Sequence, residues 1–269
     1  MRSWHDTIKY IAIALAVIII ISIISGIMYV LSFMIPIFTP DVKGENMTYE
    51  IENIISVLDI DINSIDLEVK STTDSNFRVE SNYKYLTVTE NDNKLLIKDK
   101  KSFFHNIYNE AELTLYIPED QILEKAEINT GAGATNLENI RTNIFDIKFG
   151  AGKATLQNIS ASDKASIEGG AGKLNITDSL FNNLDLDMGV GQFEFSGKLS
   201  GKNTFKMGVG SSQINLTGSA GDYKLIIKKG LGEILVDQDN VNNNTQLGQG
   251  DIELLFEGGV GSAKINFSE

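Results

Sequence analysis

A tripeptide of the form Gly-x-Gly recurs along the C-terminal half of the chain, and each copy lies between two stretches in which apolar and polar residues alternate. The segment 184–197, LDLDMGVGQFEFSG, shows the unit most clearly, with Leu184 and Leu186 before the bend and Phe193 and Phe195 after it. Alternation with a period of two is typical of a strand with one buried face. Glycines between two such strands indicate a bend at which a Cβ would collide with neighbouring backbone.

The copies share one register. The residues three and five positions before the first glycine, and the residue six positions after it, are apolar in every copy, with Asn203 as the exception. A fixed period near 20 residues predicts a solenoid, whose coils bury their apolar faces by stacking on one another. The bend glycines are Gly131, Gly133, Gly150, Gly152, Gly170, Gly172, Gly189, Gly191, Gly208, Gly210, Gly230, Gly232, Gly259 and Gly261.

A further coil is predicted upstream, at residues 58–69. The sequence LDIDINSIDLEV fits the same register if Asn63 replaces the first glycine, and asparagine tolerates the left-handed backbone region better than most residues. Residues 70–123 then form an excursion, which we interpret as antiparallel strands that cap this coil. The predicted fold is all-β, a right-handed parallel β-solenoid of about eight coils with an antiparallel N-terminal cap, preceded by one transmembrane helix.

The N-terminal segment 10–37 is uncharged and long enough to span a bilayer. A cleaved signal peptide is the alternative, but this apolar core is longer than such peptides need, and no A-x-A site follows it. Arg2 and Lys9 precede the segment and Asp41 and Glu45 follow it, which favours a cytoplasmic N-terminus. We therefore expect a single-pass protein of the cell membrane, with its C-terminal domain outside the cytoplasm. The expected parts are a cytoplasmic stub (1–9), a transmembrane helix (10–37), a linker (38–50), the first coil with its cap strands (51–123) and the Gly-x-Gly repeats (124–269).

The net charge of the chain argues against some classes of binding partner. The chain carries 23 basic and 36 acidic residues, a formal net charge of −13. Such an excess of acidic residues opposes binding to nucleic acid and to anionic lipid surfaces. The chain has no Cys, so no disulfide stabilises the fold.

The sequence predicts neither a catalytic site nor a bound metal or cofactor. Asp185 and Asp187 share one face of a strand, and Asp146 is expected one or two coils away, but alternating acidic residues are also typical of an exposed strand. The Asn-rich segment 237–251 resembles a calcium loop only in part, because Val241 stands where an EF-hand carries Asp or Asn. We therefore do not expect an enzyme, and leave open whether 237–251 binds an ion.

Two groups of residues are weak candidates for binding a partner. Phe103, Phe104 and Tyr108 form an apolar cluster in the irregular segment 101–110, which either contacts a partner or packs under the cap. The second group belongs to the final repeat, where we expect an uncovered sheet edge. Its members are Lys264, Ile265 and Phe267. Such an edge is either blunted by charged residues such as Lys264 and Glu257, covered by the segment 237–251, or open to another chain.

The N-terminal span, the LDIDINSIDLEV start, the LTLYIPED strand and the serial Gly-[Ala/Val]-Gly units resemble the bacterial putative-adhesin domain family. That family is related to the membrane-bound proteins of the cell-wall-active antibiotic response. The resemblance covers about residues 50–269 and implies a β-solenoid without a catalytic motif.

The function expected is that of a membrane-anchored extracytoplasmic binding module of the bacterial cell envelope. It would act as an accessory or regulator near the membrane, because eight coils spaced about 4.8 Å apart rise only about 40 Å. The alternatives are a surface adhesin or structural wall-binding module and, as a third, a polysaccharide-active enzyme. The expected partners are the membrane itself, an envelope membrane protein, a wall polymer or a second copy of the chain.

Overall fold

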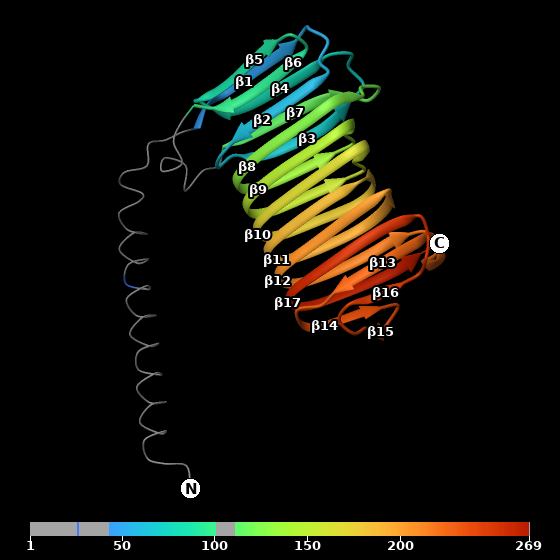
Figure 1. The fold of residues 1–269 in the computed structure, drawn as a ribbon. Coiled ribbons are helices and arrows are strands. Elements are labelled where there is room, and N and C mark those ends of the chain that lie inside the picture. Colours follow the sequence, from blue (N-terminus) through green and yellow to red (C-terminus); the bar gives the residue numbers. More distant parts are fainter. Residues whose placement is uncertain (1–25, 27–42, 101–110, 269) are drawn as a thin grey trace.

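The computed structural model describes Gly26 and residues 43–100 and 111–268. All the strands within this part of the chain belong to one continuous 17-stranded sheet, which is wound into a stack of coils (Figure 1). No helix among these residues has the length and apolarity required to cross a bilayer. The predicted transmembrane segment 10–37 lies outside the described residues except for Gly26.

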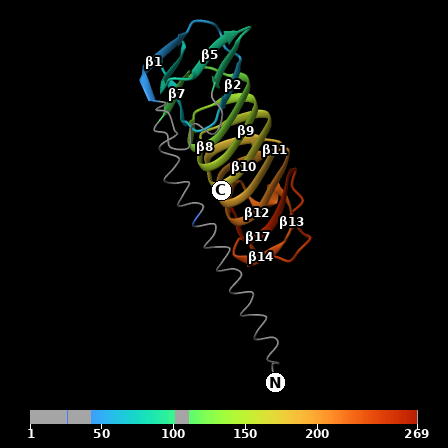
Figure 2. The same cartoon turned by 90° about the vertical axis from the view of Figure 1, so that its left-hand side faces the viewer.

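The central coils are long strands that turn a corner without interruption. Each begins with a straight run, bends at its Gly-x-Gly, and continues as a second run, and each pairs in parallel with the coil above and the coil below (Figure 2). These strands are β8 (Leu123–Glu138), β9 (Arg141–Gln157), β10 (Ser160–Asn182), β11 (Leu184–Ser200), β12 (Lys202–Thr217) and β17 (Ile252–Ser268).

The predicted inward register is confirmed along the whole stack. In β11, Leu184, Leu186, Phe193 and Phe195 are at most 1% exposed, whereas Glu194 between the two phenylalanines lies on the surface. Phe193, Phe195 and Phe205 form an edge-to-face cluster with ring centroids 5.4–5.5 Å from the ring of Phe205. Stacking therefore buries one continuous apolar core that no single coil could bury alone.

The two glycines of each bend are required for different reasons. A Cβ on Gly189 would lie 2.5 Å from the carbonyl oxygen of Gly170 in the coil above, although the φ angle of Gly189 is ordinary. Gly191 has φ +139° and would in addition overlap the carbonyl of Gly172. Close approach of successive coils thus excludes a side chain at the first position, and backbone conformation together with close approach excludes it at the second.

The coil predicted at residues 58–69 exists in the predicted register. It consists of β2 (Val57–Ile62) and β3 (Asp66–Thr72), which pair with β8 at a constant offset that places Asn63 beside Gly131. The reason given for Asn63 was wrong, however, because its φ angle is not positive. The first bend position needs only space. The strand above β2 is β6 (Lys94–Asp99), which ends before it reaches the bend. Among the described residues, therefore, no Gly-x-Gly bend lies directly above Asn63, and its side chain has room there.

The N-terminal cap is only partly antiparallel, which corrects the expectation for residues 70–123. β6 and β7 (Glu112–Pro118) pair in parallel with β2 and β3 and so add another level to the stack. The antiparallel strands are β4 (Phe77–Tyr83) on β7, β5 (Leu86–Asn91) on β6, and β1 (Lys43–Ile51) on β4.

The far end of the stack corrects a second expectation, because the last repeat in the sequence is not the last coil in space. β17 lies between β12 on one edge and β13 (Tyr223–Lys228) with β14 (Leu231–Val236) on the other (Figure 1). The Asn-rich segment supplies β15 (Asp239–Asn240) and β16 (Thr245–Leu247), which pair antiparallel with β14 and β13. A short 3₁₀ turn, Ala220–Asp222, leads from β12 into β13. The predicted open edge at the last repeat is therefore paired on both sides.

Candidate binding surfaces

The stack presents two strand faces that meet at the corner formed by the bends. We call the face before the bends the leading face, which carries the outward side chains of β2, β8–β12, β17 and β13. We call the face after the bends the trailing face, which carries the outward side chains of β3, β8–β12, β17 and β14. Charged side chains are more frequent on the leading face, and amide and hydroxyl side chains on the trailing face.

The leading face is charged. Two positions before each bend, an outward column runs the length of the stack, with opposite charges at most of its successive levels. Lys148 Nζ lies 2.9 Å from Glu168 Oε1, and this hydrogen bond raises the pKa of Lys148. Lys228 Nζ lies 2.7 Å from Glu257 Oε1. In stacking order the column reads Asp61, Asn129, Lys148, Glu168, Asp187, Lys206, Glu257, Lys228.

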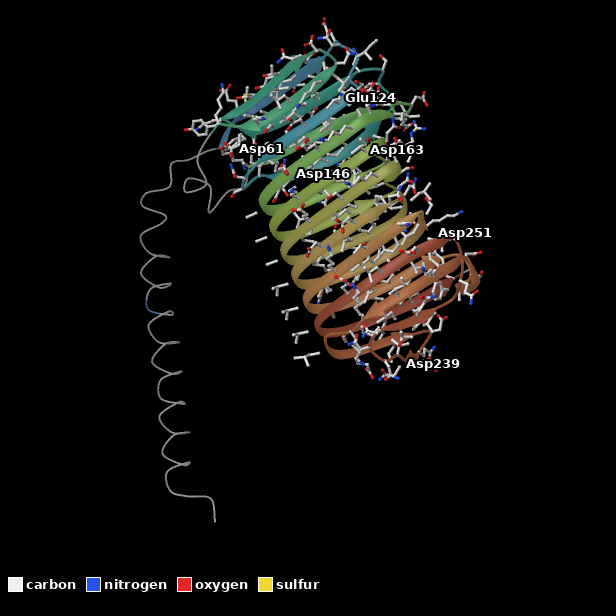
Figure 3. The ribbon with its side chains drawn as sticks, viewed as in Figure 1. Asp61, Glu124, Asp146, Asp163, Asp239 and Asp251 are labelled. Atoms are coloured by element: carbon white, nitrogen blue, oxygen red, sulfur yellow. The ribbon has the colours of Figure 1, made fainter. Side chains whose placement is uncertain are left out.

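The carboxylates considered for acid–base chemistry lie on this face. Asp146 pairs in register with Ser166, which pairs with Asp185, so Asp146 and Asp185 are two coils apart. Asp185 and Asp187 are exposed, and Asp61 and Asp146 lie on the same side of the stack (Figure 3). Asp185 and Asp187 are suited to hydration and ion pairing, which is how Glu168 is used with Lys148 beside them. Asp146 is half-buried, and its Oδ1 has no hydrogen-bond partner among the described residues.

The trailing face carries amide and hydroxyl side chains along its middle levels, whereas Glu68 and Lys70 of β3 and Lys153 and Lys173 beside the bends are charged. Its central column in β8–β12 and β17 reads Asn136, Thr155, Asn175, Glu194, Gln213, Lys264. A shallow hollow of about 290 Å³ lies on this face and is lined by residues that include Asn175, Thr177, Ser196, Gln213 and Asn215. Sequence reasoning missed this face, although the outward positions after each glycine pair would have revealed it.

The corner between the faces carries a column of exposed apolar side chains, one from the middle of each bend. Val190, Val209, Val260 and Leu231 occupy four successive levels and are 52%, 47%, 49% and 75% exposed. Alanines occupy this position in β8, β9 and β10. Figure 3 shows a row of short side chains along this edge of the stack. We call the four larger residues the corner ridge.

The binding residues expected from the last repeat do not form an open patch. Ile265 is fully buried, and Phe267 packs against Tyr223 with 5.3 Å between ring centroids. Lys264 is exposed, but it belongs to the trailing face, where it lies opposite Gln213. Phe103, Phe104 and Tyr108 lie outside the described residues, so their binding role stays a prediction.

The Asn-rich segment uses its polar side chains to attach itself to the last two coils of the stack. Asp237 Oδ1 accepts a hydrogen bond from the Phe267 backbone N–H at 3.2 Å, and Asn243 Oδ1 accepts one from the Lys229 N–H at 2.8 Å. Asn240 donates to Glu233 at 3.2 Å. Within residues 43–100 and 111–268, no group of three or more His, Cys, Asp or Glu side chains is placed to hold a metal ion.

The stack of parallel coils and its two long outward faces define a repeat protein of the β-solenoid class. The chain belongs to the Toastrack DUF4097 family, which it matches over residues 55–269. The resemblance noted in the sequence is thereby confirmed. No curated protein matches the chain.

Several solved structures are similar to the chain at low identity. A putative adhesin from Bacteroides fragilis is 17% identical, with 85% of this chain and 99% of that chain covered and a TM-score of 0.41. A putative cell adhesion protein from Clostridium sporogenes is 16% identical, with 84% and 100% covered and a TM-score of 0.34. A putative adhesin from Parabacteroides distasonis is 12% identical, with 83% and 98% covered and a TM-score of 0.36.

Proposed function

We propose that the protein is a non-enzymatic binding module of the bacterial cell envelope, which binds an uncharged polymer such as a wall glycan along its trailing face. Of the functions expected from the sequence, this is the surface-binding alternative rather than the regulatory one. The apolar segment 10–37 would anchor the module in the membrane, with the solenoid outside the cytoplasm.

The observation that carries this proposal is the chemistry of the trailing face. From β8 to β12 its central column reads Asn136, Thr155, Asn175, Glu194 and Gln213, so four of these five side chains are amides or a hydroxyl. Glu194 is already paired, with its Oε1 2.7 Å from Lys173 Nζ. Amides and hydroxyls both donate and accept hydrogen bonds, so a row of them suits a partner rich in hydroxyl and acetamido groups.

Geometry supports a linear partner. Parallel coils repeat about every 4.8 Å, and the pairing keeps equivalent side chains in register from β8 to β12 and β17. A rigid row of this kind loses little conformational entropy on binding, because its backbone is already fixed. The hollow beside Asn175 and Gln213 offers a place where one polymer unit would sit.

Co-sedimentation of the full chain with purified bacterial wall sacculi would test this function. We expect an Asn175→Ala, Gln213→Ala variant to bind at least tenfold more weakly than the original chain. An Asp185→Ala variant, altered on the leading face, should bind normally. Equal binding by all three proteins, or no binding by the original chain, would contradict the proposal.

A further inference from the structure

The corner ridge is an apolar surface that no segment within residues 43–100 and 111–268 covers. Val190, Val209, Val260 and Leu231 stand in line at the corner, and each is flanked by two glycines that have no side chain to shield it. At about 4.8 Å per coil, the line extends for about 14 Å. Four aligned apolar side chains, larger than the alanines at the other levels of the corner, mark a contact surface.

A column of charge runs beside the ridge on its leading-face side. At the four levels of the ridge it reads Asp187, Lys206, Glu257, Lys228. On the trailing-face side, the positions next to the bends are Gln192, Ser211, Ser262 and Glu233, of which only the last is charged. The charge pattern that a partner must match is therefore on the leading side.

This column is complementary to itself when read in reverse. A twofold axis that crosses the ridge at right angles brings a second copy in antiparallel to the first and keeps leading side against leading side. Asp187 then faces Lys228 of the second copy, and Lys206 faces Glu257 of the second copy. All four charges of each copy meet an opposite charge.

We propose that the corner ridge is a self-association surface, at which two copies of this chain pair antiparallel about a twofold axis between the levels of Val209 and Val260. The apolar residues of the two ridges pack against each other, and glycines on both sides let the two backbones approach closely. The contact is small beside a standard interface, so the dimer is weak and depends on protein concentration. It uses the corner and not the trailing face, so it stands or falls independently of polymer binding.

The charges also select the register. If the axis lay between β10 and β11, Lys148 would face Lys206 of the second copy, and Glu168 would face Asp187 of the second copy. Those contacts are all between like charges, and the alanine corners of β9 and β10 would replace half of the ridge. The favourable charge register and the larger apolar side chains therefore coincide at the same four levels.

Cysteine cross-linking of the full chain tests this geometry, because the chain has no Cys of its own. Two single variants, Val209→Cys and Val260→Cys, are co-expressed with different tags. We expect a disulfide-linked heterodimer between them under mild oxidation, whereas an Ala151→Cys chain paired with either should give at least tenfold less. Equal cross-linking by Ala151→Cys, or none at the ridge, would overturn the proposal.

Charge inversion is the second arm of the test. In a variant with Asp187→Lys, Lys206→Glu, Glu257→Lys and Lys228→Glu, all four charges are reversed, so it should self-associate like the original chain. It should not associate with the original chain, because every contact across the axis would then join like charges. Free mixing of the two proteins in sedimentation or pull-down experiments would overturn the proposal.

A Val209→Asp variant separates self-association from lipid binding. We expect it to keep its melting temperature, because Val209 is exposed, and to weaken dimerisation at least tenfold. If the original chain is monomeric at every concentration tested, and Val209→Asp instead reduces binding of the chain to zwitterionic vesicles, the ridge contacts lipid and the proposal is wrong.

Discussion

Asn266 donates a hydrogen bond from Nδ2 to Oδ1 of Asn215 across 3.0 Å, although a whole repeat of the sequence lies between their strands. The same neighbours are joined at Asn203, whose side chain reaches the carbonyl of Glu253 at 3.2 Å. β17 thus stacks directly on β12, and the repeat that contains Gly230, which follows β12 in the sequence, lies one level further out. The order of coils in space therefore differs from their order in the sequence.

The bends give a first prediction about stability. Gly191→Ala should lower the free energy of unfolding by at least about 2 kcal/mol, because the new Cβ would overlap the Gly172 carbonyl at a φ of +139°. Gly258→Ala is the matched control, since its Cβ would meet Ile234 and Phe256 at an ordinary 3.4 Å. That control should be neutral or stabilising by up to about 1 kcal/mol. Thermal and urea unfolding of the full chain would measure both, and equal losses would contradict the account of the bends.

The core gives a second prediction. Phe195→Ala should lose roughly 3–5 kcal/mol, because the ring is 1% exposed and packs edge-to-face on Phe205. Glu194→Ala, one residue away, removes only a surface pair with Lys173 and should change stability by less than about 0.5 kcal/mol. The comparison requires urea unfolding of each variant. A loss at Glu194 that matches the loss at Phe195 would mean that the inward register is wrong.

Asn203 gives a third prediction. Its Oδ1 accepts from the Leu184 N–H at 2.9 Å, and its Nδ2 donates to the Glu253 carbonyl at 3.2 Å, within the core at 2% exposure. Asn203→Leu would leave both backbone groups unpaired and should cost about 2–4 kcal/mol. The buried Oγ of Ser212 has no hydrogen-bond partner among the described residues, so Ser212→Ala should be neutral or stabilising. Unfolding midpoints of both variants would decide, and a neutral Asn203→Leu would argue against a linking role for this side chain.

Tyr223 gives a prediction about pH. Burial raises the pKa of its hydroxyl above the usual 10.0, and the hydroxyl donates to the Thr217 carbonyl at 2.8 Å. Below pH 10 the tyrosine is neutral in both folded and unfolded chains. As the pH rises above that value, the unfolded chain loses this proton first, so stability falls.

Tyr223→Phe isolates this effect from other groups that titrate at high pH. The variant should be less stable at pH 8 by about 1 kcal/mol through loss of the hydrogen bond, but it should lose less stability than the original chain between pH 8 and pH 11. Urea unfolding at several pH values would measure the two slopes. Parallel slopes would show that Tyr223 does not titrate differently in the folded chain.

The sequence predicts the shape of each coil because that shape is local. A period of two and a pair of glycines determine which residues point inward, and this holds even for the coil of Asn63, where the pattern lacks glycine. Which coil stacks on which is not a local property, so periodicity could not reveal that β17 lies between β12 and the coil of β13 and β14. One signal was present: sequence order would stack Lys206 on Lys228, whereas Glu257 lies between them in the structure.

The candidate surfaces were predicted less well than the core. The weak binding residues were sought at an open edge, yet Ile265 is buried because strands pair on both sides of β17. The trailing face and the corner ridge follow from outward positions of the same repeat, so they could have been found by reading each column in turn. The order of the side chains within each of the two surfaces still depended on the stacking order, which only the structure supplies.

The position of β17 has a consequence for how the protein is made. The ribosome synthesises β12 first and β13 to β16 next. The strands of the outermost coil are therefore made before β17, the coil on which they stack. Until residues 252–268 arrive, β12 has an unpaired edge, and β13 and β14 lack the strand with which they pair in parallel. Exposed edges of this kind recruit other chains, so the interval between synthesis of β12 and entry of β17 is the period in which the protein is most vulnerable to misassembly. A duplication of repeats between β8 and β12 would not disturb the insertion of β17 between β12 and β13. A duplication between β13 and β17 would instead supply two segments that compete for that one position.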